Sequence, residues 1–187
     1  MVEVLAAVLL ISCGSETTTT IEKLEKPPMS LASPAFTYGA VLPDRYAVGS
    51  PGMDRIPSPP LEWANVPDGA RCFALIFYDV EKAAAGRYGV FWFALNLAAD
   101  VRYLAEGAGG RGADAGDGLG SYGGIGRSRG RPHRFLFVLY ALDAPVSCTW
   151  LLTGPADFEE AAAGHILAKA ELACYQPRDR LSIPKMM

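Results

Sequence analysis

Three short apolar segments constrain the fold of this 187-residue chain most strongly. They are residues 72–78, 90–97 and 135–142, which are rich in aromatic and β-branched side chains and bounded by Gly, Pro, Asp or Ala-Gly stretches. Short runs of this composition are typical of strands. Because their apolar side chains are continuous rather than alternating, both faces of these strands must be covered. The sequence therefore predicts a mostly β sandwich.

One helix is predicted near the C-terminal end. Pro155 suits a first helical turn, and acidic residues follow it near the positive end of the helix. Phe158, Ala162 and Ile166 fall on one face at helical spacing. We expect this helix to pack on the sandwich and the chain to return as a strand over residues 168–175.

The size and charge of the chain indicate one domain without a nucleic-acid partner. Half of the residues are apolar and one fifth are charged, which suffices for one sizeable core. The net charge of −3 gives no general attraction to nucleic acid or to an anionic membrane. Arginines gather locally between Arg127 and Arg134, and we interpret this cluster as a solvated loop face.

The N-terminal residues 1–13 resemble a lipoprotein signal peptide. Residues 4–11 form an apolar run that is too short to span a bilayer, and Cys13 follows as the residue that would carry the lipid. The departure is Glu3, which stands where Lys or Arg is usual. Three explanations of this segment stay open: the true start lies upstream, the signal peptide is atypical, or the segment is an apolar disordered tail.

Residues 14–28 predict a tether, because a Thr run and a charged stretch ending in two prolines cannot pack a core. The folded domain is then residues 29–187. If Cys13 is lipidated, we expect the protein to be extracytoplasmic and anchored to the membrane. If it is not, we expect a secreted or cytoplasmic protein.

Three further cysteines lie in the expected domain, at Cys72, Cys148 and Cys174. Outside the cytoplasm two of them can form a disulfide. Cys148 with Cys174 is the favoured pair, although the sequence does not fix it. No C-x-x-C occurs, so we expect no structural zinc site, and no cofactor is predicted.

Residues 107–130 contain 11 of the 20 glycines and predict a long exposed loop. The loop holds a G-x-G-x-x-G pattern at 118–123 and a G-x-S-x-G pattern around Ser128. Both need a strand before them and a helix after them, and neither has that context. Asp143 and His165 follow Ser128 in the order of a hydrolase triad, but we decline this assignment on the same ground.

An ordered set of short motifs resembles the phosphatidylethanolamine-binding protein family, in its prokaryotic Raf-kinase-inhibitor-like branch. The resemblance covers roughly residues 31–175. Its pieces are Ser33-Pro34-Ala35-Phe36, Ser58-Pro59-Pro60-Leu61-Glu62-Trp63, Asp79 after the first apolar run, Trp92, Asn96, Tyr122-Gly123-Gly124, Pro132-His133-Arg134, Tyr140-Ala141-Leu142-Asp143 and Gly164-His165-Ile166-Leu167-Ala168.

The resemblance implies a single-domain antiparallel β-sandwich with a C-terminal helix, with an anion-accepting pocket at one end and usually no enzymatic activity. In this chain the pocket would bring Asp79 and His133 together at neighbouring strand ends. A carboxylate beside an imidazole orients the ring and favours its protonated form, which donates to a phosphate or carboxylate. The turn at Tyr122, Gly123 and Gly124 would add backbone donors and a phenol ring.

Departures from the family pattern change the expected pocket. Glu81 replaces a second Asp, Phe91 stands where relatives carry a second histidine, and Ile125 replaces a Pro. Fewer cationic donors and more apolar surface raise the desolvation cost of an ionic ligand. We therefore expect weaker or altered binding of a small anionic or phospholipid-headgroup-like ligand.

Other interpretations stay open. His133 can be a strand-edge residue bonded to a carbonyl. The protein can act as a peptidase or kinase inhibitor that meets a target protein through exposed loops such as 107–131, with a vestigial pocket, or be a structural family member without a ligand. We expect no enzyme, because no nucleophile stands beside a base in a credible context.

Overall fold

The computed structural model describes residues 26–48, 56–109, 120–128, 130–147 and 154–178. These residues form two sheets. The larger sheet has the order β2-β8-β7-β4-β5, and the smaller has the order β1-β3-β6. The bounds of the larger sheet's strands are Ala40–Val41 for β2, Cys72–Asp79 for β4, Val90–Ala98 for β5, Arg134–Leu142 for β7 and Ile166–Tyr175 for β8.

Strands β4 and β7 form the centre of the larger sheet and pair antiparallel along their whole length, from Cys72 opposite Leu142 to Asp79 opposite Phe135. Every residue of β4 is buried, and in β7 only Arg134 is exposed. The predicted strands are confirmed. Both faces of β4 and β7 are covered as predicted, whereas β5 alternates buried residues with half-buried or exposed ones.

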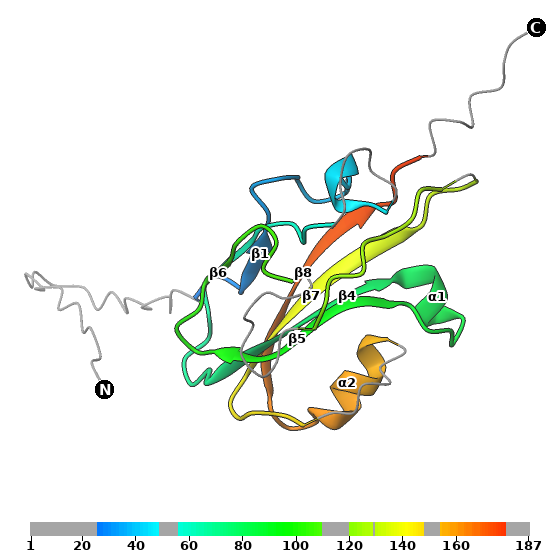
Figure 1. Ribbon diagram of the computed structural model, residues 1–187. Coiled ribbons are helices and arrows are strands. Elements are labelled where there is room, and N and C mark those ends of the chain that lie inside the picture. Colours follow the sequence, from blue (N-terminus) through cyan, green and yellow to red (C-terminus); the bar gives the residue numbers. More distant parts are fainter. Residues whose placement is uncertain (1–25, 49–55, 110–119, 129, 148–153, 179–187) are drawn as a thin grey trace, which may run out of the picture.

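The smaller sheet covers one face of the larger one, as Figure 1 shows. It consists of β1 (Ser30–Ala32), β3 (Leu61–Ala64) and β6 (Tyr103–Leu104). Its Trp63 packs edge-on against Phe73 of β4, with ring centroids 5.5 Å apart. Burial of such large apolar side chains is the main stabilising contribution to the sandwich.

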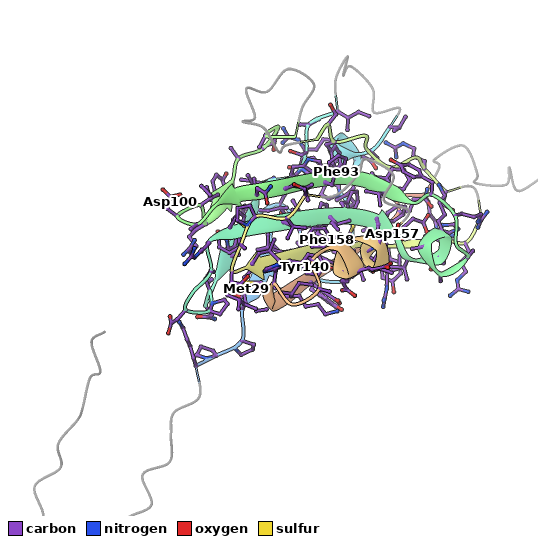
Figure 2. The ribbon with its side chains drawn as sticks, turned by 90° about the horizontal axis from the view of Figure 1, so that it is seen from below. Met29, Phe93, Asp100, Tyr140, Asp157 and Phe158 are labelled. Atoms are coloured by element: carbon purple, nitrogen blue, oxygen red, sulfur yellow. The ribbon has the colours of Figure 1, made fainter. Side chains whose placement is uncertain are left out.

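Helix α2 (Pro155–Ala161) covers the opposite face, in line with the predicted packing (Figure 1). Figure 2 shows Phe158 of α2 close to Tyr140 of β7, and their ring centroids are 4.9 Å apart. The helix is shorter than predicted, because Gly164 adopts a left-handed φ of 83° and Ile166 already belongs to β8. A φ of this sign suits glycine and ends helical geometry.

Four further features differ from the predictions. Strand β2 pairs with β8 in parallel, whereas the larger sheet's other pairs are antiparallel. A short helix, α1 (Val80–Ala84), follows β4 where no helix was predicted, and a 3-10 turn, η1, spans Asp44–Tyr46. Residues 120–128 of the glycine-rich segment are not fully exposed as predicted, since Tyr122 and Ile125 are buried in the core.

The cysteines also correct a prediction. Cys174 is a buried free thiol, contrary to the favoured pairing with Cys148, which lies outside the described residues together with Cys13. Cys72 is buried and free as well, at the other end of β7 from Cys174. Burial raises the pKa of the Cys174 thiol to about 12. None of the helices in the described part of the chain has the length and apolar character needed to cross a membrane.

Candidate ligand-binding site

Asp79 and His133 meet at one end of the larger sheet. Because β4 and β7 are antiparallel neighbours, the last residue of β4 lies beside the start of β7, and His133 immediately precedes that strand. The Oδ2 of Asp79 lies 2.7 Å from the Nδ1 of His133. The predicted convergence of these two side chains is confirmed.

The carboxylate of Asp79 is almost fully buried, and both of its oxygens have partners. Its side chain is 2% exposed, and its Oδ1 accepts a hydrogen bond of 2.8 Å from the N–H of Lys82, which caps helix α1. The His133 side chain is 38% exposed. The pair therefore presents an imidazole to solvent, and a buried carboxylate fixes the orientation of that ring.

Glu81 lies beside this pair, on the first turn of α1. Its Oε2 accepts a hydrogen bond of 3.1 Å from the N–H of Arg134. Asp79, Glu81 and His133 each offer one metal-ligating atom, and these three atoms lie within 4.8 Å of one another. The predicted pocket residue Glu81 thus belongs to the same cluster.

Phe91 provides the apolar surface that the sequence predicted at this end of the sheet. Its ring packs edge-on against Phe77 and Phe135, with centroid distances of 6.4 and 5.5 Å. The Nζ of Lys82 lies 5.0 Å from the centroid of the Phe91 ring. At this position the chain has a ring that interacts with a cation and donates no hydrogen bond, in place of the second histidine that the family resemblance led us to expect.

The predicted donors of the Tyr122-Gly123-Gly124 turn are largely engaged inside the protein. The Tyr122 hydroxyl donates to the Tyr46 carbonyl at 2.9 Å, and burial raises the pKa of this phenol well above its usual value. The N–H groups of Tyr122 and Gly123 donate to the carbonyls of Gly109 and Phe91. The Gly123 N–H is thus bonded to β5, and both donors of Tyr122 are bonded elsewhere within the protein, so these three groups are not free to serve as the predicted ligand donors.

Gly124 has a backbone conformation that suits glycine, whereas its predicted role as a ligand donor stays a prediction. Its φ of 65° is left-handed, and a Cβ at this position would lie 3.0 Å from the Cδ1 of Ile56. The glycine therefore serves a tight backbone turn and close packing.

A surface cavity of about 570 Å³ lies next to His133 and was not predicted. Gln176 links the two, since its N–H donates to the His133 carbonyl at 3.1 Å and its Oε1 accepts from the His133 N–H at 3.5 Å. The residues lining the cavity are Val41, Arg131, Pro132, Tyr175, Gln176 and Arg178. Sequence reasoning treated Arg131 as part of a solvated face, although its neighbour Pro132 already belonged to the recognised motif.

The hydrolase-like pattern does not assemble into a triad. The N–H of Ser128 donates to the Pro177 carbonyl, beyond the end of β8, whereas His165 precedes the start of β8. His165 does contact Asp143, with an Nδ1 to Oδ1 distance of 2.8 Å. Ten strand residues at about 3.3 Å each put roughly 30 Å between this pair and Ser128.

Fold and site together define a β-sandwich with a buried carboxylate and a half-exposed imidazole at the end of its larger sheet. The chain belongs to the phosphatidylethanolamine-binding protein family, whose model matches residues 32–176. This finding confirms the family resemblance drawn from the motifs.

Relatives from several organisms agree with this assignment. A UPF0098 protein of Chlamydia muridarum is 36% identical over 151 residues, covering 77% of this chain and 95% of the relative. The UPF0098 protein YbhB of Escherichia coli is 33% identical over 125 residues, covering 62% of this chain and 78% of the relative.

Two solved structures are also similar. The crystal structure of CT736 from Chlamydia trachomatis, described as a putative phosphatidylethanolamine-binding protein homologue, matches with a TM-score of 0.62 and 31% identity, covering 81% of this chain and 99% of that one. YbcL of Escherichia coli matches with a TM-score of 0.66 over 82% of this chain and all of that one. At 23% identity, this second likeness shows the fold alone.

Proposed function

We propose that this protein is a non-enzymatic binding protein that holds a small ligand with an anionic group, such as a phospholipid headgroup, beside His133. The observation that carries the proposal is the contact of 2.7 Å between Asp79 and His133, with the carboxylate buried and the imidazole open to solvent. The buried carboxylate holds the ring in one orientation, so that its exposed part can meet a ligand from solvent.

The adjoining cavity supports the same ligand chemistry. Arg131 and Arg178 line it, and in the described part of the chain neither forms an ion pair with an acidic side chain. Guanidinium groups bind phosphate and carboxylate in bidentate geometry. Val41 and Tyr175 add apolar surface at the same place. We therefore propose a ligand that combines a phosphate or carboxylate with a short apolar part.

The inhibitor-like alternative has less support from the described residues. It relied on an exposed loop over residues 107–131, but part of that loop is bound to the sandwich through Tyr122 and Ile125. Absence of catalysis belongs to the proposal, and the separation of Ser128 from the His165–Asp143 pair supports it.

Titration with phenyl phosphate and with O-phosphoethanolamine, followed by isothermal calorimetry, tests the proposed function. We expect one ligand per chain and a loss of affinity of at least about tenfold in His133→Ala, since hydrogen bonds to charged groups contribute about 1.5–3 kcal/mol. His165→Ala is the matched control, because His165 contacts an acid in the same way at the other end of β8. Equal binding by wild type and His133→Ala would refute the proposal.

Membrane attachment through Cys13 is a separate proposal. The apolar run at residues 4–11 before Cys13 supports it. In cells that lipidate proteins, Cys13→Ala should move the protein from the membrane to the soluble fraction. Unchanged partitioning would remove the lipoprotein interpretation without affecting the ligand site.

A further inference from the structure

We infer that Asp79, Glu81 and His133 form a binding site for a divalent metal ion, with zinc as the ion that fits best. The ligating atoms of these three side chains lie within 4.8 Å of one another. They come from the end of β4, the first turn of α1 and the residue before β7 (Figure 1). Within the described ranges, no other histidine, cysteine or acidic side chains gather in a group of three.

The donor set suits zinc. Two carboxylates and one imidazole are ligands that zinc accepts, and a three-ligand site leaves a position open for water or a ligand. In a tetrahedral site, two atoms bound to one ion at about 2.1 Å lie about 3.4 Å apart. The widest pair in the cluster must therefore close by about 1.4 Å, and rotation of the exposed Glu81 side chain would supply this movement.

Hydrogen bonds from the backbone already hold the two carboxylates. The N–H of Lys82 holds Oδ1 of Asp79, and the N–H of Arg134 holds Oε2 of Glu81, so each acid keeps one oxygen that no backbone group binds. The remaining oxygen of Asp79 lies 2.7 Å from Nδ1 of His133, so an ion bound by these two atoms would replace the proton that they share. The backbone N–H groups would orient the two carboxylates as metal ligands, and partners of this kind raise metal affinity.

The charge of the cluster favours a cation. Two carboxylates face one imidazole, so the cluster is negative in either protonation state of His133. In the described part of the chain, neither Asp79 nor Glu81 is paired with Lys or Arg, and the ammonium of Lys82 lies over the Phe91 ring instead. A buried carboxylate without a full counter-charge is costly, and a divalent ion would compensate it.

This site differs from the zinc site that the sequence excluded. A missing C-x-x-C argues only against structural sites built from thiolates. The metal site uses His133, as the proposed ligand site does, but it does not require an anionic ligand. A bound ion would place positive charge beside the cavity lined by Arg131, and would replace the cationic donor that Phe91 removes.

Calorimetric titration of EDTA-treated full-length protein with zinc chloride tests the inference, together with cobalt chloride monitored by visible absorption. We expect one ion bound per chain and a cobalt spectrum typical of nitrogen and oxygen ligands. Glu81→Gln and His133→Gln should each weaken zinc binding at least about tenfold. Glu81→Gln is the cleaner variant, because its side chain is exposed and the new amide oxygen still accepts the Arg134 N–H.

His165→Gln is the matched control, since His165 and Asp143 form a pair of similar geometry without a third ligand. Unchanged zinc affinity in His165→Gln, with loss in Glu81→Gln, supports the site. Absence of zinc binding to wild type, or equal binding by Glu81→Gln, overturns it. Phenyl phosphate titrated into the EDTA-treated protein tests the anion proposal separately, so either proposal can fail alone.

Discussion

Asp79 contacts His133 at 2.7 Å with one carboxylate oxygen, while its other oxygen caps helix α1 through the Lys82 N–H. The orientation of the imidazole and the position of Glu81 on the first turn of α1 therefore depend on the same buried side chain. A change at Asp79 is expected to affect both the stability of α1 and the binding properties of His133.

Asp79→Ala should lower the free energy of unfolding by about 1–2 kcal/mol, because it removes a helix cap and a hydrogen-bonded partner of His133. Asp79→Asn should cost less, since Asn is also a good N-cap. Urea denaturation at neutral pH measures both. Asp68→Ala is the control, because Asp68 is paired with Lys26 on the surface and its side chain is 99% exposed. Equal losses in Asp79→Ala and Asp68→Ala would contradict the capping role.

The strands and the Asp79–His133 pair could be predicted from the sequence because continuous apolar runs define the central strands, and antiparallel pairing brings the end of one beside the start of the other. The short helix α1 also had a signal. Asp79 is a favourable cap and is followed by the helix formers Glu81, Lys82 and Ala83.

The rest of the site depends on contacts that no local pattern specifies. Whether the Gly123 N–H is free or bound to Phe91 depends on how the glycine-rich segment lies along β5. The cavity beside His133 joins Val41, Arg131 and Arg178, which are distant in sequence. They meet because both β2 and β7 pair with β8. A cavity lined by side chains from such distant segments can be recognised only in the folded chain.

Phe91→His should tighten the binding of phenyl phosphate by roughly 5–30-fold, because it adds a donor near His133 that contributes about 1–2 kcal/mol in a desolvated site. It should also lower stability, since the Phe91 ring packs against Phe77 and Phe135. Phe91→Leu is the control that removes the ring without adding a donor. Calorimetric titration compares Phe91→His with Phe91→Leu. A gain in affinity in both variants would show that the bulk of the Phe91 ring, rather than a missing donor, limits binding.

Gly109→Ala should destabilise the protein by about 1–3 kcal/mol, because a Cβ at residue 109 would lie 2.5 Å from the Cε2 of the buried Trp92 indole. The indole Nε1 donates to the Gly120 carbonyl at 2.9 Å, so displacing the ring also disturbs that hydrogen bond. Urea unfolding followed by tryptophan fluorescence reports both effects. Gly126→Ala is the control, since its Cβ would meet no atom within 4 Å. A stable Gly109→Ala with an unshifted emission maximum would show that this contact relaxes without cost.

Tyr46→Phe should make the stability of the protein less sensitive to alkaline pH. Burial, followed by a hydrogen bond of 2.9 Å to Oε2 of Glu106, raises the pKa of Tyr46 to about 12 from 10.0. Because the unfolded state ionises first, the stabilising contribution of Tyr46 is complete below pH 10 and is lost as the pH rises to about 12. This difference in pKa corresponds to about 2.7 kcal/mol.

Urea denaturation of wild type and Tyr46→Phe across this range measures the difference. At neutral pH the variant should be less stable by about 1 kcal/mol, because Glu106 loses one donor and keeps its ion pair with Arg45. Above pH 10 this difference should shrink and then reverse, because only wild type loses the contribution of the Tyr46 hydroxyl. Buried Tyr140 and Tyr122, whose pKa values are also raised, ionise in both proteins and leave a common decline. A parallel decline in wild type and variant would show that the Tyr46 hydroxyl does not titrate with the shift described.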